Sequence, residues 1–195
     1  MTAMPWHGGT VIEELTSDHR EVERLFARIE ELPPSSPERR VCADRAVSRL
    51  MRHSSAEEAF LYPAVREHVP DGDALADKEI ADHAAVERLA AGLDGLPADH
   101  PDLDRVLREL IREVRAHVAD EENRLFPLLA AEVSEEQLVF LGDKVRITLT
   151  RAPLRPHPSA PHSPAAHKML GPVLRIADRV RDAVSGRGRR PPGEA

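Results

Sequence analysis

An internal duplication restricts the possible folds of this chain more than any other feature of the sequence. Residues 18–25 (DHREVERL) recur as residues 82–89 (DHAAVERL), with identity at six of eight positions. At the same offset of 64 residues, HSSAEE at 53–58 recurs as HVADEE at 117–122, and LYP at 61–63 recurs as LFP at 125–127. One structural unit is therefore used twice, and we expect a pseudo-two-fold axis to relate its copies.

The repeated unit is predicted to be a pair of helices. Apolar residues recur at steps of three and four, which is typical of one helix face, and aromatic residues make up only 3% of the chain, which disfavours β-sheet. Helix starts are indicated by a capping box at Thr10, by Ser36 and by Asp73, and Pro63 predicts a kink. The sequence thus predicts an all-α, up-down-up-down four-helix bundle over residues 10–132, with helices at about 10–32, 36–68, 73–93 and 102–132.

The C-terminal third differs from the bundle in composition and charge. A short helix is expected at 134–150, a Pro-rich linker at 151–166, and an amphipathic helix followed by a basic tail at 167–195. Residues 1–143 carry 16 Lys/Arg against 31 Asp/Glu, whereas residues 144–195 carry 11 against 3. The acidic bundle is therefore not expected to bind nucleic acid, and the tail is a candidate for self-association or for contact with a protein partner.

Other sequence features limit the location and the type of site. No apolar run approaches the length of a membrane span, and the first residues have no signal-peptide pattern, so we expect a cytoplasmic protein. The single cysteine, Cys42, excludes an internal disulfide framework and a thiolate-rich metal site.

Histidines occupy positions on the apolar stripes where leucine would be expected. They are His19, His53, His83 and His117, one for each predicted long helix. In the second and fourth helices a glutamate follows one turn later on the same face, Glu57 and Glu121. Counting residues from the predicted turns places all six side chains at one level near mid-bundle. Two carboxylates in an apolar layer would repel each other, and bound metal removes this cost.

The symmetry of the set indicates how many ions it could hold. Each half supplies two histidines and one glutamate, which gives three protein ligands per ion if two ions bind. Mixed imidazole and carboxylate ligands suit iron or manganese and tolerate zinc, although a single zinc ion would leave ligands unused. A purely structural polar layer is the alternative.

The pattern H…H-x-x-x-E…H…H-x-x-x-E, with a trailing E-x-x-L-aromatic-Pro, resembles the hemerythrin-like (HHE cation-binding) family over residues 10–132. The resemblance implies a four-helix bundle with two iron ions joined by an oxo or hydroxo bridge. It implies that the four histidines are terminal ligands and that Glu57 and Glu121 are bridging ligands. The small molecules handled by such proteins include O2, H2O2 and NO.

The sequence departs from the oxygen-carrier pattern at Glu79, where carriers have a further histidine. Either Glu79 is a ligand, or one iron keeps an exchangeable position. We therefore expect catalase-like or peroxidase-like reaction with peroxide, or chemistry with nitric oxide. The alternative is an oxygen, nitric oxide or iron sensor without turnover. Further candidates beside the site are Glu58, Glu122 and Tyr62 as additional ligands or as neighbours of the ligands, and Asp18 and Asp82 as groups that orient imidazoles.

Overall fold

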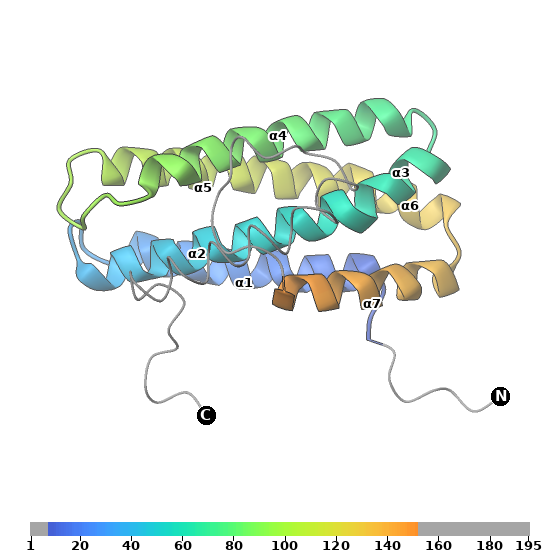
Figure 1. The fold of residues 1–195 in the computed structure, drawn as a ribbon, viewed down its shortest axis with the longest axis horizontal. Helices are drawn as coiled ribbons and strands as arrows, with labels where there is room; N and C mark the ends of the chain where they lie inside the picture. The colour runs from blue at the N-terminus through green and yellow to red at the C-terminus, as the bar shows by residue number, and fades with distance from the viewer. Residues whose placement is uncertain (1–7, 152–195) are drawn as a thin grey trace.

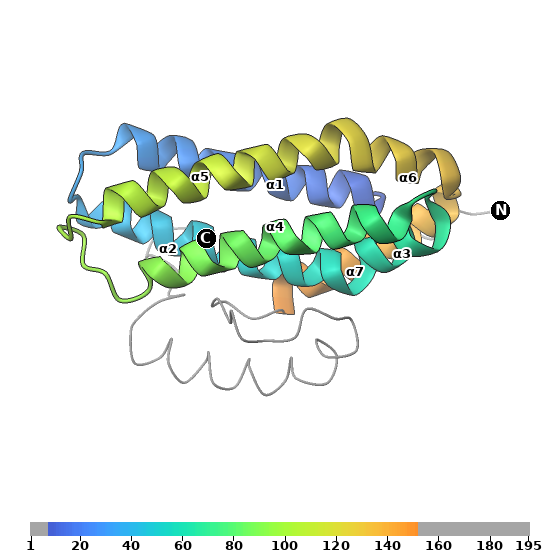
Figure 2. The same ribbon diagram turned by 90° about the horizontal axis from the view of Figure 1, so that it is seen from above.

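The computed structural model describes residues 8–151, and this part of the chain is all-helical. Four long helices lie side by side along one axis and form the bundle, with a further helix against its outside (Figures 1 and 2). The bundle helices are α1 (Val11–Glu31), α2 (Pro37–Ala56), α4 (Gly72–Leu93) and α5 (Leu103–Asp120). Short helices extend two of them, α3 (Tyr62–His68) beyond α2 and α6 (Phe126–Glu132) beyond α5, and α7 (Glu135–Arg151) follows.

Two of the expected helix starts are confirmed and one is wrong. Thr10 and Glu13 form the capping box of α1, and the Ser36 hydroxyl accepts a hydrogen bond at the start of α2. The third helix was expected to be capped by Asp73, but α4 begins at Gly72 and its preceding residue makes no side-chain cap. The chain turns tightly after α3, and α4 begins directly from this turn. Gly72 lies so close to the Val65 carbonyl group that a side chain at this position would clash with it.

The kink expected at Pro63 is instead a π-helical turn that precedes the proline. The π-helix spans Glu57–Leu61 (η1), and a second one spans Glu121–Leu125 (η2) at the equivalent place in the other half. Proline has no N–H and its ring crowds the carbonyl four residues earlier, so each helix widens by one residue before it. In the first of these turns the adjacent residues Glu57 and Glu58 are both buried, whereas in the second Glu121 is buried and Glu122 is partly exposed.

The apolar core consists of two clusters, one in each half of the bundle's length. Val22 and Leu50 belong to the first, while Leu15 and Leu61 belong to the second. His19 lies between Leu15 and Val22 on one stripe, so the histidine layer separates the two clusters. Packing on both sides therefore holds the polar layer at a set height.

The helix α7 packs against α1 and α2 on the outside of the bundle. Ser134 and Gln137 bond to each other at its start. No helix within residues 8–151 combines the length and the apolar character needed to cross a membrane. The predicted linker beyond Arg151, the amphipathic helix and the basic tail lie outside the described residues.

Gly142 permits the close approach of α7 to the start of α1, and we predict that Gly142→Ala lowers stability. A Cβ at this position would clash with the Gly9 carbonyl oxygen, so α7 would have to move away. We expect a loss of about 1–3 kcal/mol in the free energy of unfolding, measured by urea denaturation followed by circular dichroism. Gly92→Ala is the control: its Cβ would meet nothing closer than 3.9 Å, and we expect a gain of about 0.5–1 kcal/mol. Equal effects of the two substitutions would contradict this account of α7.

Candidate metal centre

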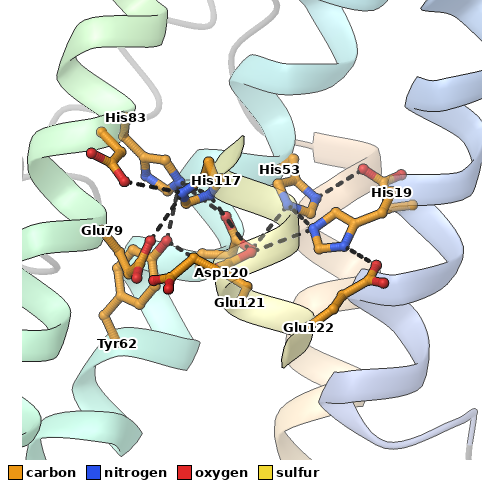
Figure 3. Close-up of polar contacts among 12 residues, drawn as sticks. His19, His53, Tyr62, Glu79, His83, His117, Asp120, Glu121 and Glu122 are labelled. Carbon is orange, nitrogen blue, oxygen red and sulfur yellow. Dashed lines mark hydrogen bonds and ion pairs between the residues drawn. The ribbon is translucent and has the colours of Figure 1, made fainter. Parts of the chain in front are cut away.

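Four imidazoles, one from each long helix, meet in the middle of the bundle (Figure 3). His19 (α1) and His53 (α2) face each other with their Nε2 atoms 3.0 Å apart, and His83 (α4) and His117 (α5) do so at 3.2 Å. All four side chains are buried. Two nitrogen lone pairs repel each other at this distance, so each pair requires a proton or a cation between its nitrogens.

Two carboxylates complete the layer, and each faces one imidazole from each pair. The Glu57 oxygens lie 2.9 Å from His53 Nε2 and 3.2 Å from His83 Nε2. Glu121 Oε2 lies 3.5 Å from His19 Nε2 and 3.6 Å from His117 Nε2. Both glutamates are fully buried. Each carboxylate thus faces both histidine pairs.

The buried carboxylates test whether a metal ion fits these residues. Among the described residues, both oxygens of Glu57 and Oε2 of Glu121 accept no hydrogen bond, although imidazole nitrogens lie close to them. Buried anionic oxygens without hydrogen bonds are costly unless a cation neutralises them. In the part of the chain that the structure describes, three groups of side chains place their ligand atoms within 4.8 Å of one another: His19, His53, Glu57 and Glu121; Glu57, His83 and His117; and Glu79, Asp82 and His117 at the outer side of the layer. The donor set therefore fits metal ions.

The outer nitrogen of every imidazole lies beside a carboxylate. The partners are Glu122 with His19 at 2.8 Å, Asp18 with His53 at 3.0 Å, Glu58 with His83 at 3.1 Å, and Glu79 with His117 at 3.0 Å. A carboxylate at Nδ1 favours the tautomer with its proton there, which directs the Nε2 lone pair inward toward a metal. Glu58 and Glu122 each come from the opposite half of the duplication to the histidine they contact.

The second half departs from the symmetry at Glu79. Asp82 is equivalent to Asp18, but it lies 3.9 Å from His117 Nδ1, and Glu79 lies closer. The Glu79 carboxylate lies beside Nδ1, the outer nitrogen of His117, and not beside the four Nε2 atoms. The sequence analysis did not predict the ion pairs around Glu79. In these pairs the Lys78 ammonium contacts the carboxylates of Glu79, Asp82 and Asp120. The Lys78–Asp82 spacing of four residues was the available signal.

Tyr62 and Phe126 are equivalent in the duplication, and they make the two ends of the layer chemically different. The Tyr62 hydroxyl donates to Glu121 Oε1 at 3.1 Å and lies 3.1 Å from His83 Nε2. Phe126 instead stacks on the His19 ring, with centroids 5.9 Å apart. The tyrosine thus adds a hydroxyl at the His83–His117 end, where the phenylalanine adds only an apolar ring at the His19–His53 end.

Proton affinities in the layer reflect burial and the facing charges. Burial lowers the pKa of His53, but the charges of Glu57 and Asp18 outweigh it and raise the pKa to about 10. Burial opposes ionisation of Glu57, yet the facing His53 and His83 hold the pKa of its carboxyl well below the usual range. Burial and the nearby Glu121 raise the pKa of Tyr62, so its hydroxyl stays protonated. Protons on imidazoles thus balance the carboxylates, and a metal ion would displace them.

Residues 10–129 match the model of the hemerythrin HHE cation binding domain. The chain belongs to this family. It is 25% identical over 173 residues to an uncharacterized hemerythrin-like protein of Schizosaccharomyces pombe, covering 88% of this chain and 85% of that one. It is 29% identical over 122 residues to a Nostoc protein named DNA nickase, covering 62% of this chain and 33% of that protein.

A solved structure has the same fold. It is that of a hemerythrin HHE cation binding domain-containing protein from Mycobacterium kansasii, with a TM-score of 0.66 and 20% identity, covering 89% of this chain and 99% of that one. The expected hemerythrin-like fold and family are confirmed. The family implies metal binding, and the His/Glu clusters of the layer are the groups available for it.

The unequal contacts of Asp18 and Asp82 lead to a prediction with a built-in control. Asp18 is buried and lies 3.0 Å from His53 Nδ1, whereas the Asp82 side chain is 38% exposed and lies 3.9 Å from His117 Nδ1. We expect Asp18→Asn to weaken ferrous iron binding by about 10- to 100-fold, because the imidazole loses the group that orients it. Asp82→Asn should leave the affinity nearly unchanged. Competition with a chelator measures both, and equal losses would contradict the assigned roles.

Proposed function

We propose that the chain holds two iron ions, one at each histidine pair, with Glu57 and Glu121 shared between them. The observation that carries the proposal is that each buried carboxylate faces one Nε2 atom from each pair. His19 and His53 would hold one ion and His83 and His117 the other, which gives each ion nitrogen and oxygen ligands. Such mixed ligands suit iron, with manganese as the nearest alternative and zinc less suited.

We propose that the centre reacts with a small oxidant and decomposes peroxide. Iron would supply the change of oxidation state that this reaction needs. A cavity of about 10 Å³ lies beside the four imidazoles, with walls that include Val22, Leu50, Val86 and Val114. This is about the space that one water molecule needs, so the site would admit only a molecule of a few atoms. The apolar walls keep bulk water away from the histidines.

Tyr62 is proposed as the group that donates a hydrogen bond to a ligand at the His83 end. Its hydroxyl is buried, protonated, and 3.1 Å from both Glu121 Oε1 and His83 Nε2. Glu79 is proposed as a residue that positions His117, because it lies at the outer nitrogen. Glu58 and Glu122 are proposed to position His83 and His19 in the same way.

A sensor of oxygen, nitric oxide or iron is the second candidate. The charge difference between the acidic residues 1–143 and the basic residues 144–195 favours it, since a basic segment could be held or released by the bundle. The likeness to the Nostoc protein named DNA nickase does not support DNA cleavage by this chain. That likeness spans a third of the Nostoc protein, and an acidic bundle repels phosphates.

Iron loading and peroxide turnover test the proposal together. Purified full-length protein loaded with ferrous iron should contain about two iron ions per chain, and it should evolve oxygen from hydrogen peroxide. A His53→Leu, His117→Leu double variant should lose both properties while staying helical. Two iron ions without oxygen evolution would favour the sensor, and a wild-type chain that takes up no metal would contradict both candidates.

Tyr62→Phe tests the proposed hydrogen-bond donor by making the first half match the second, which has Phe126. We expect the iron content to stay the same and peroxide turnover to fall by about 100-fold, as is typical when a positioned proton donor is lost. Oxygen evolution measured with a Clark electrode gives the rate. Unchanged turnover at unchanged iron content would show that the hydroxyl has no part in the reaction.

A further inference from the structure

A groove between α1 and α5 leads from the surface to His19. Its volume is about 270 Å³. It is lined by charged residues of both signs and by apolar side chains. The charged residues are Arg20, Glu23, Arg115 and Glu122, and the apolar ones include Val22, Phe26, Val114, Val118 and Ala119.

The groove meets the small cavity beside the imidazoles. His19, Val22, Val114 and Val118 line both the groove and the cavity, so these side chains form a common wall. A rotation of the Val118 side chain, which is partly exposed, would require no movement of the backbone. The path from solvent to the four Nε2 atoms is therefore short on this side.

The duplication shows that the lining of the groove is specific to one half. Its equivalent would lie between α4 and α2, where Ala84 replaces Arg20 and Glu58 replaces Glu122. Glu58 is only 3% exposed, whereas the Glu122 side chain is 22% exposed. Asp18 and Glu79, the other carboxylates beside outer imidazole nitrogens, are also buried. Glu122 is thus the member of this set that faces solvent.

One ion pair lies between the groove and the imidazole. Glu122 contacts His19 Nδ1 through Oε1 at 2.8 Å (Figure 3). Its Oε2 accepts a hydrogen bond from Arg20 at 2.5 Å. The Arg20 side chain is 53% exposed, so it can leave the pair without a burial cost. Arg115 is paired with Glu23 and Glu30. The two arginines and two glutamates of the lining therefore sum to zero formal charge, with Glu30 as a further carboxylate beside Arg115.

We propose that small ligands reach the metal centre through this groove on the His19 side, and that the Arg20–Glu122 pair selects by charge what passes. The proposal rests on the proposed function, because it assumes ions at the histidine pairs. The chemical class that fits is a neutral molecule of a few atoms, such as hydrogen peroxide or nitric oxide. A small anion passes more slowly when Arg20 does not balance Glu122.

Blocking the groove tests the route, with a matched control from the other half. Full-length protein is loaded with ferrous iron, and nitric oxide association is followed by stopped-flow absorption. Ala119→Trp places an indole in the groove, and we expect association to slow by about 10-fold or more because ligand access limits the rate. Ser55→Trp, the equivalent substitution in the other half, should bind at the wild-type rate. Equal rates for the two variants would overturn the route.

Arg20→Ala tests the selection by charge and does not depend on the tryptophan variants folding. Azide binding to the oxidised protein should slow several-fold at low salt, because Glu122 is left unbalanced, while nitric oxide association to the reduced protein should be unchanged. Arg24→Ala, one turn along α1 and outside the groove lining, should change neither rate. Equal azide rates in Arg20→Ala and wild type would overturn the role of the ion pair.

Iron content separates failure of this proposal from failure of the proposed function. It is measured for every variant, with circular dichroism as the check of folding. If wild-type protein holds no iron, the proposed function fails and the route fails with it. If wild-type protein holds iron and binds nitric oxide, but the groove variants bind it at the same rate, only the route fails.

Discussion

Two carboxylates buried at the centre of a helical bundle are the constraint on which this structure depends. Glu57 and Glu121 have no exposure to solvent, and isolated charges there would cost more free energy than a small domain can lose. Four imidazoles surround them, and each imidazole is itself held by a carboxylate at its outer nitrogen. The layer is therefore a network of alternating charge that becomes neutral only with protons or metal ions in it.

The rest of the fold keeps this layer at one height and in register. Apolar clusters lie on both sides of it, so no long helix can slide without exposing apolar surface. The π-helical turns begin at Glu57 and Glu121 themselves. In each turn the first glutamate faces the Nε2 atoms, and the next reaches the outer nitrogen of a histidine in the other half. A regular helix rotates successive side chains by about 100°, and the wider π-helical turn reduces this rotation.

Much of the site could be predicted from sequence because its main constraint is periodic. The duplication, the H-x-x-x-E spacing and the interruption of apolar stripes at His19 and His83 indicate one layer of six residues. The π-helical turns could not be predicted, since Pro63 is equally compatible with a simple kink. The sequence also could not predict that Glu79, and not Asp82, lies closer to the outer nitrogen of His117. Both carboxylates are on α4 and both are within reach of that imidazole. The position of the Tyr62 hydroxyl depends on how α3 leaves the bundle axis, which no local pattern encodes.

The most direct test of the central claim is X-ray absorption spectroscopy at the iron edge on the iron-loaded full-length protein. The account predicts scattering from two imidazoles per iron together with oxygen ligands, and an iron–iron path of roughly 3–4 Å. Exchanging His19 and His83 for leucine should remove half of the imidazole scattering. A spectrum with a single isolated iron, or one without imidazole scattering, would contradict the assignment of the buried layer as a two-ion centre.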